Sequence, residues 1–300
     1  MSRTTARRRT ALSVVALLTV TGGALTACSD PDGDAAETSP SASTRTGETT
    51  QRLVDNDGHR VAFYVTPGHG PTIVLDAGGG EDASSWDELV PELHAATGAT
   101  VITYDRAGLG ASDGVPGPWD VESAVDDLEA GLHELGVTDD VVLVSHSQAG
   151  EIATWFAQDN PTMLSGAVLV DANLPPFFTD EEIARLVAFS QPQVDAAKQD
   201  PDDPQNRQLL ATAESFVATS TAFHQLTWPD AVPATVIVSE NTPFDGSPDD
   251  VRRWQDAAAQ FVQDGPTRTL ITAEGSSHDV PQDRPDLVLH EIESMVAARH

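Results

Sequence analysis

The sequence predicts an α/β fold with a mostly parallel central sheet, helices on both faces and a helical lid inserted between two strands. Short aliphatic segments typical of strands alternate with amphipathic helical segments along most of the chain. The strand segments are apolar at nearly every position, which indicates a sheet buried on both faces, as parallel sheets are. The alternation stops only over about 172–233, where helical patterns follow one another. Alternation of this kind places the sheet between two layers of helices, joined by right-handed crossovers.

The individual elements follow from local patterns. Segments 53–54 and 60–65, on either side of an Asn-Asp-Gly turn, are expected to form a hairpin. The strands expected after it are 72–76, 100–104, 141–145, 166–171, 234–239 and 267–272. The expected helices, in which apolar residues recur every three or four positions, are 84–97, 121–135, 148–158, 248–263 and 285–298. In the lid we expect helices over 180–189 and 206–224, separated by a joint rich in Pro, Asp and Gln.

The first residues resemble an export signal. Arg3 and Arg7–Arg9 give a basic start, and residues 11–25 are uncharged and mostly apolar. This run is too short to span a bilayer, which takes about 20 residues, but it suits the apolar region of a signal peptide. The run ends in Leu-Thr-Ala-Cys28, which resembles the lipobox of bacterial lipoproteins. We therefore expect a signal peptide over 1–27 and a lipid-modified Cys28.

The next segment, 28–50, is expected to be a disordered tether that leads to a folded domain over 51–300. Residues 29–50 contain no Val, Ile, Leu or aromatic residue. Such a segment cannot bury enough apolar surface to order itself. With a lipid on Cys28, it predicts an exported protein that is anchored to the outer face of the cell membrane.

The composition excludes several classes of function. The chain has 47 acidic and 16 basic residues and a formal net charge of −31, which argues against nucleic acid as a partner because that requires a basic surface. The single cysteine excludes an internal disulfide framework and cysteine-based metal clusters. The glycine run 78–80 matches neither GxxxxGK nor GxGxxG, so the sequence argues against nucleotide binding. We expect neither a metal nor a cofactor.

The sequence Ser145-His-Ser147-Gln148-Ala149-Gly lies between a predicted strand and a predicted helix. A serine in that position sits on a tight, strained turn, with small residues two positions before and after it. The N-terminus of the following helix adds partial positive charge near a developing oxyanion. Ser147 is therefore the candidate nucleophile.

A serine hydroxyl needs a general base, and His278 is the best candidate. It follows the last predicted strand, in a loop at the same edge of the sheet. The imidazole needs a carboxylate to orient it. Asp171 ends the strand after the nucleophile's helix and is favoured, and the residues after the next strand, Asp245 and then Glu240, are the alternatives.

Acyl chemistry also needs backbone N–H donors that face the developing oxyanion. Two are expected. One is the N–H of Gln148, directly after the nucleophile, and the other is the N–H of Gly79, in the glycine turn after strand 72–76.

With these residues in place, the sequence over about 51–298 resembles the α/β-hydrolase superfamily. The resemblance rests on the glycine turn with Trp86 downstream, the segment Tyr104–Asp113 (YDRAGLGASD), the Ser147 elbow, and Gly-Ser-Ser-His278 followed by Pro285. The chain order Ser, Asp, His also matches. Two departures are Ser145, where the elbow usually has glycine, and a loop after residue 239 without the compact Gly-x-x-Asp of many members. Asp105, Arg106 and Asp113 are interpreted as scaffold around the site.

The resemblance implies a serine hydrolase that cleaves an ester, thioester, lactone or amide through an acyl-enzyme. Family members that open epoxides or remove halide use aspartate as the nucleophile. The expected substrate is a small acyl compound with an apolar group, because six of the sixteen aromatic residues fall in the lid. The alternatives are other chemistry on the same triad, such as cofactor-free peroxidation, C–C hydrolysis or acyl transfer, and a non-catalytic binding lipoprotein.

Overall fold

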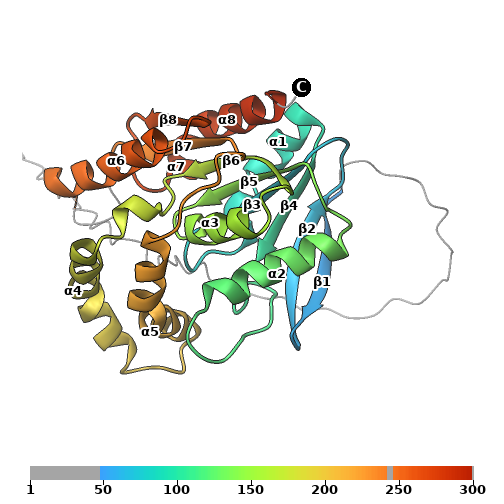
Figure 1. The fold of residues 1–300 in the computed structure, drawn as a ribbon. Coiled ribbons are helices and arrows are strands. Elements are labelled where there is room, and N and C mark those ends of the chain that lie inside the picture. The colour runs from blue at the N-terminus through green and yellow to red at the C-terminus, as the bar shows by residue number, and fades with distance from the viewer. Residues whose placement is uncertain (1–47, 242–245, 299–300) are drawn as a thin grey trace, which may run out of the picture.

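The sheet has eight strands in the order β1-β2-β4-β3-β5-β6-β7-β8 within residues 48–241 and 246–298, which the computed structural model describes (Figure 1). The first two pairings, β1 with β2 and β2 with β4, are antiparallel, and all the others are parallel. The mostly parallel α/β sheet that the sequence predicts is therefore confirmed. The strands are β1 Thr50–Asn56, β2 His59–Thr66, β3 Thr72–Asp76, β4 Thr100–Asp105, β5 Val141–His146, β6 Leu164–Val170, β7 Ala234–Ser239 and β8 Arg268–Ala273.

The central strands are buried because both of their faces are covered. Every residue of β3, β5 and β7 is buried. Side chains at alternate positions enter two separate apolar cores, so that Val236 and Val238 pack on one face and Ile237 on the other. Continuous aliphatic strands are the sequence signature of this arrangement.

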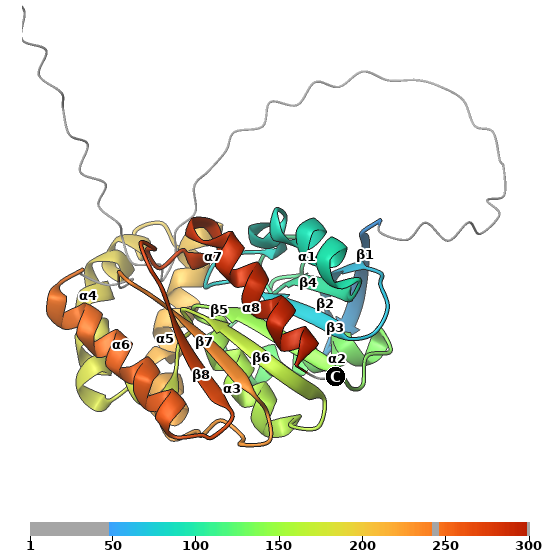
Figure 2. The ribbon, with the colours of Figure 1, turned by 90° about the horizontal axis from the view of Figure 1, so that it is seen from above.

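Two layers of helices cover the sheet, as Figure 2 shows from above. Helices α1 and α8 pack over one face, and α2, α3 and α6 contribute to the core on the other. The helices outside the insert are α1 Leu89–Thr97, α2 Val121–Glu134, α3 Ala149–Asp159, α6 Pro248–Gln263, the short α7 Val280–Asp283 and α8 Pro285–Ala297. The helix expected over 84–97 is divided, because a 3-10 turn, η1 Ala83–Trp86, precedes α1.

The segment between β6 and β7 is a helical insert, as predicted. It contains a 3-10 turn, η2 Pro175–Phe177, and two helices, α4 Asp180–Ala197 and α5 Pro204–His224. The joint that we expected to begin near residue 190 is shorter, because α4 continues through Pro192. Pro192 removes the donor to the carbonyl of Ala188, and both residues are exposed, so solvent can hydrate that carbonyl.

Four ionic side chains attach the insert to the body. Arg185 of α4 contacts Asp250 of α6 at 2.7 Å, and Arg253 of α6 contacts Glu182 of α4 at 2.7 Å. Each arginine also contacts the acid of its own helix. Asp250 is fully buried and Glu182 nearly so. Paired carboxylates are tolerated at such depth, whereas a lone buried charge is costly.

Apolar residues of the insert complete this attachment. Phe177 packs edge-on against Trp254 of α6, with ring centroids 4.8 Å apart. Phe178 packs against Phe223 within the insert, and Phe223 stacks on Trp155 of α3. These side chains belong to the core on the α3 face, so they fasten the insert to the sheet.

The N-terminal predictions fall mostly outside the described residues. The expected signal peptide 1–27, Cys28 and the tether up to residue 47 are among the residues that the structure does not describe. Thr50, which we included at the end of the tether, is the first residue of β1. Among the described residues, no helix is both long enough and apolar enough to cross a bilayer.

Candidate active site

Ser147 occupies the turn between β5 and α3. Its φ of 54° lies in the left-handed region, which is costly for a residue with a side chain. Two backbone bonds hold the turn: the N–H of Ser147 donates to the carbonyl of Val170 at 3.2 Å, and the N–H of Asn173 donates to the carbonyl of Ser147 at 2.8 Å. The strained elbow is therefore built by the ends of two neighbouring strands.

Small residues around Ser147 allow this turn to form. A Cβ on Gly150 would lie 2.3 Å from the carbonyl oxygen of Asn173, so the close approach requires glycine. Ser145, which stands where the elbow usually has glycine, is fully buried in β5. The turn keeps its geometry with serine at this position.

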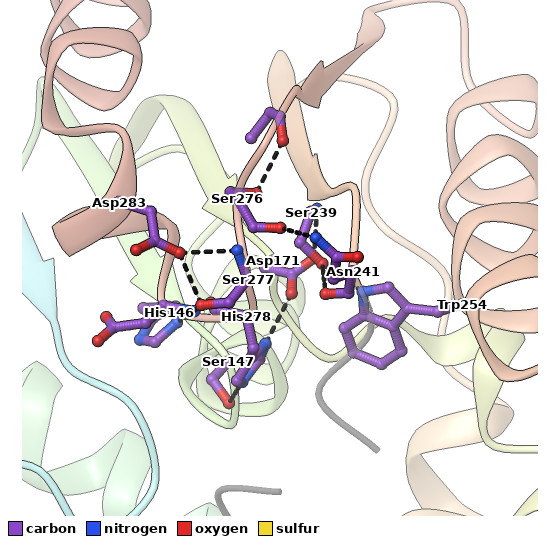
Figure 3. Close-up of polar contacts among 12 residues, drawn as sticks. His146, Ser147, Asp171, Ser239, Asn241, Trp254, Ser276, Ser277, His278 and Asp283 are labelled. Carbon is purple, nitrogen blue, oxygen red and sulfur yellow. Dashed lines mark hydrogen bonds and ion pairs between the residues drawn. The ribbon is translucent and has the colours of Figure 1, made fainter. Parts of the chain in front are cut away.

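His278 lies in the loop after β8 and faces Ser147 (Figure 3). Its Nε2 is 2.7 Å from Oγ of Ser147, and its Nδ1 is 2.6 Å from Oδ2 of Asp171. The side chain of His278 is 13% exposed, while that of Asp171 is fully buried. The three residues form a continuous hydrogen-bonded line from a hydroxyl through an imidazole to a carboxylate.

Asp171 is held more firmly than the sequence indicates. It also has a left-handed φ, of 41°. Its second carboxylate oxygen, Oδ1, accepts the backbone N–H of Ser239 at 2.8 Å and the indole N–H of Trp254 at 2.7 Å. These donors stabilise the ionised carboxylate and fix its orientation. Sequence reasoning missed Trp254, whose apolar spacing on α6 is that of an ordinary core residue.

The two alternative acids are placed differently. Glu240 is exposed and its Oε2 accepts the N–H of Gly275 at 2.6 Å, so it braces the loop that carries His278 without contacting the imidazole. Asp245 lies outside the described residues. Of the candidate carboxylates that the structure describes, Asp171 alone contacts His278.

The backbone N–H groups of Gly79 and Gln148 both lie next to the elbow. A Cβ on Gly79 would lie 2.6 Å from Oε1 of Gln148, so the glycine turn passes directly over the residue after the nucleophile. Neither N–H has a hydrogen-bond acceptor among the described residues. Two unoccupied donors beside a nucleophile are the arrangement that an oxyanion hole needs.

A buried arginine shapes this glycine turn. Nη1 of Arg106 donates to the carboxylate of Asp76 at 2.7 Å and to the carbonyl of Ala77 at 2.6 Å, and Nη2 donates to the carbonyl of Gly78. Burial raises the pKa of Asp76, and the charge of Arg106 opposes this effect. The carbonyls of Ala77 and Gly78 are held by Arg106 and the N–H of Gly78 by Glu81, so the N–H of Gly79 is the donor of this turn that is left for a ligand. Arg106 is thus scaffold, as expected.

His146, beside the nucleophile, points away from it. Its Nε2 is 3.0 Å from the carbonyl oxygen of His278, and its Nδ1 is 3.6 Å from Oε2 of Glu81. Burial lowers the pKa of His146, but the nearby carboxylate of Glu81 outweighs burial and raises it above 6.5. Burial raises the pKa of Glu81, and the contact with His146 outweighs that effect and lowers it.

A second buried carboxyl lies one helical turn beyond the nucleophile. Glu151 of α3 is 4% exposed and accepts Nδ2–H of Asn173 at 2.7 Å. Burial raises the pKa of Glu151 to about 7, against the opposing effects of Asn173 and Arg106. Within the described residues, no group of three or more His, Cys, Asp or Glu side chains is placed to hold a metal ion.

Fold and site together define an α/β hydrolase. The model of the alpha/beta hydrolase family matches residues 73–291, and the chain belongs to this family. The matched segment runs from β3 to α8 and contains all the site residues described above.

Proteins that are similar to this chain have different names. The chain is 31% identical over 124 residues to a soluble epoxide hydrolase of Corynebacterium sp. (strain C12), covering 41% of this chain and 42% of that one. It is 33% identical over 128 residues to a non-heme haloperoxidase of Rhodococcus erythropolis, covering 42% and 45%. The chain thus spans less than half the length of these curated relatives. Among solved structures, the esterase EaEST from Exiguobacterium antarcticum superposes with a TM-score of 0.62 over 83% of this chain and 100% of that one, at 16% identity, which shows a common fold.

Proposed function

We propose that this protein is a serine hydrolase that cleaves an ester-like bond through an acyl-enzyme. The observation that carries the proposal is the line from Ser147 through His278 to Asp171, with distances of 2.7 Å and 2.6 Å. The class of bond includes esters, thioesters, lactones and amides, because a serine nucleophile attacks an acyl carbon.

In this mechanism Nε2 of His278 takes the proton of Ser147 as its Oγ attacks the carbonyl carbon. Asp171 accepts Nδ1–H of His278, so the lone pair of the neutral imidazole is on Nε2 and faces the serine. The N–H groups of Gly79 and Gln148 stabilise the oxyanion. His278 then protonates the leaving group. In the second half of the reaction, His278 takes a proton from water as the water attacks the acyl carbon, and it returns that proton to Oγ of Ser147 as the acid is released.

A serine at position 147 separates this chain from some of its relatives. Opening an epoxide or removing halide is carried out in this family with an aspartate nucleophile, so we do not propose these reactions. The similarity to a haloperoxidase supports one second candidate, in which hydrogen peroxide attacks the acyl-enzyme and releases a peracid. Assay of peracid from a carboxylic acid and hydrogen peroxide, beside ester hydrolysis, distinguishes the two products.

The test is covalent labelling with a fluorophosphonate, followed by mass mapping of the adduct. We expect a single adduct on Ser147 that is lost in S147A and strongly slowed in H278A. As a matched control, S190A removes a hydroxyl of α4 that bonds only the carbonyl of Val187, and it should label at the wild-type rate. A folded wild-type chain without label and without turnover of any ester would contradict the proposal and favour a binding protein.

The choice of acid has its own pair of variants. D171N keeps the size of the side chain and removes its charge, and D245N does the same at the alternative position. We expect D171N to slow labelling severely and D245N to leave it unchanged. The reverse result would move the role to Asp245.

We propose further that the acyl group is apolar. The helical insert, which begins directly after Asp171, is rich in aromatic residues. This supports an apolar neighbourhood, although many of these residues are buried in contact with the body. Nitrophenyl acetate, butyrate and octanoate measure the preference. We expect kcat/KM to rise with acyl length, and a preference for acetate would contradict it.

We also propose that the chain is exported and anchored through a lipid on Cys28. The support is the basic and apolar N-terminus and the lipobox-like residues before the single cysteine. Growth with radiolabelled palmitate should label the wild-type chain and not C28A, and C28A should leave the membrane fraction. Equal labelling of both chains would contradict this.

A further inference from the structure

We propose that His146 and Glu81 form a positioning pair, an imidazolium and a carboxylate, that aligns the oxyanion turn and the loop of His278 with Ser147. This inference rests on the proposed hydrolase function and adds to it a protonation state that the reaction requires. Both residues lie outside the line of Ser147, His278 and Asp171.

The pair joins three chain segments that are far apart in the sequence. His146 is the last residue of β5, directly before the nucleophile. Its Nε2 is 3.0 Å from the carbonyl oxygen of His278, in the loop after β8. Its Nδ1 is 3.6 Å from Oε2 of Glu81, and that same oxygen accepts the N–H of Gly78 at 3.0 Å. Gly78 precedes the proposed oxyanion donor.

The two contacts of His146 indicate which of its ring nitrogens carry a proton. A carbonyl oxygen only accepts hydrogen bonds, so Nε2 of His146 carries a proton. Nδ1 faces a carboxylate, and this contact is attractive only when Nδ1 is protonated as well. If Nδ1 lost its proton, its lone pair would face the negative charge of Glu81. The arrangement therefore suits an imidazolium.

The surrounding charges favour the same state. Asp171, after β6, and Asp279, in the loop after β8, are the other carboxylates whose charge acts on His146. Burial raises the pKa of Asp279, and the charge of His146 opposes that effect. The ring of His278 lies 5.1 Å from that of His146, centroid to centroid, so the pair is packed directly beside the proposed base.

The pair is packed directly against the backbone that it positions. A Cβ on Gly78 would lie 2.8 Å from Oε2 of Glu81 and 3.0 Å from Nδ1 of His146. Release of Glu81 would therefore remove both a hydrogen bond and a close contact from the oxyanion turn. A displacement of a fraction of an ångström there weakens catalysis, because the donors must meet the oxyanion and not the ground-state carbonyl.

A pH dependence follows, and its sign is fixed. His278 must be neutral to act as a base, so activity falls on the acid side. The pKa of His146 is raised in the folded chain. The aligned state is therefore complete below the usual histidine value and is lost as the pH rises through the raised value. We therefore expect kcat to fall at alkaline pH as His146 loses its proton.

The experiment is the pH profile of kcat and KM for wild type, H146Q, E81Q and the double variant. Both glutamines keep a polar side chain and remove the titrating charge. We expect each single variant to lower kcat about 10-fold with KM changed less than about twofold, as suits a small misplacement. The alkaline fall should disappear in H146Q and move to lower pH in E81Q. The double variant should be no slower than the slower single variant, because the two residues act as one unit.

H59Q is the matched control. His59 and Asp127 form another mostly buried histidine–carboxylate pair, at 2.9 Å, which joins β2 to α2 away from the triad. This variant should lower thermal stability and leave the pH profile unchanged. An H146Q profile with the wild-type alkaline fall, or a loss in H146Q that H59Q reproduces, would overturn the proposal.

Nuclear magnetic resonance of histidine-labelled full-length protein gives a readout that does not need turnover. The His146 signals, assigned with H146Q, should remain those of an imidazolium to a higher pH than the signals of solvent-exposed histidines, because the pKa of His146 is raised. Loss of the proton at a lower pH than in those histidines would overturn the proposal. A wild-type chain with no turnover and no label on Ser147 would overturn this proposal together with the hydrolase function. An active wild type with an unchanged H146Q profile would overturn this one alone.

Discussion

The body of the molecule and its helical insert are both close to the proposed triad, but they are held in place in different ways. In the body, backbone hydrogen bonds position the reactive residues: the N–H of Ser147 donates to the carbonyl of Val170, and the N–H of Asp171 donates to the carbonyl of Ile237. The insert is attached mainly by side chains, through the ionic contacts between α4 and α6 and the aromatic contacts of η2.

This difference separates two kinds of sensitivity. A position set by the backbone survives the loss of a neighbouring side chain, whereas a position set by side chains does not. Chemistry and placement of the insert should therefore respond to different substitutions. Trp254 is the exception, because its indole N–H binds Asp171 while its ring packs against Phe177.

The largest expected effect is a loss of rate in the body without a loss of fold. D171N should lower kcat about 10⁴-fold, because a neutral amide no longer stabilises the imidazolium or selects the required tautomer of His278. The far-ultraviolet circular dichroism and the KM should change little. A variant with more than a tenth of wild-type kcat would show that another group orients His278.

The insert should respond in the opposite way. D250N removes a fully buried charge that binds Arg185 and Arg253, and we expect it to lower the free energy of unfolding by about 3 to 5 kcal/mol. Hydrogen exchange should accelerate over α4 more than over β5. Labelling of Ser147 by a small fluorophosphonate should stay within about threefold of wild type. If labelling fell as far as in D171N, the two regions would not be separable.

A third substitution, E151Q, tests the contact between the body and the start of the insert. Asn173, at the root of the insert, binds Glu151 of α3. Because the pKa of Glu151 is raised from 4.5 to about 7, the unfolded chain releases this proton first, so stability falls as the pH rises from about 4.5 to about 7. E151Q should remove this decline and exceed wild type by at most about 3 kcal/mol at pH 8, with no gain at pH 4. Urea unfolding at the two pH values measures it, and equal differences at both would contradict it.

The smallest effect is expected where one side chain serves both regions. W254F keeps an aromatic ring against Phe177 and removes the donor to Asp171. One hydrogen bond to a charged group supports about a 10-fold loss of kcat. The backbone N–H of Ser239 still holds the carboxylate, so the loss should stay well below that of D171N. A loss equal to that of D171N would show that the Trp254 side chain, and not the backbone N–H of Ser239, orients the carboxylate of Asp171.

The sequence was sufficient for the fold because each strand and helix carries its own pattern. Runs such as 72–76 and 141–145 are strands wherever they pair, and the elbow follows from one strand and one helix in succession. The helix through Pro192 was missed because the proline's effect depends on whether the orphaned carbonyl is exposed. That is a property of the folded surface.

The site was predictable as far as it depends on neighbours in the chain. The acid stayed open between Asp171, Asp245 and Glu240 because the choice depends on which loop meets His278. The roles of Trp254 and Glu81 depend on contacts across 83 and 65 sequence positions, respectively, by residue number. No local pattern marks such a contact, since a tryptophan on an apolar helix face predicts only burial.

Two of the four non-glycine residues with a left-handed backbone in the described part of the chain, Ser147 and Asp171, belong to the proposed triad and set a limit on how stable an active form of this protein can be. Each holds a backbone conformation that costs about 1 to 3 kcal/mol for a residue with a side chain and little for glycine. Selection for heat resistance alone would thus favour glycine at both places, where the hydroxyl and the carboxylate would be lost. Stabilising substitutions therefore have to be sought at other positions. At these two residues, a gain in stability would remove a side chain that the proposed reaction needs.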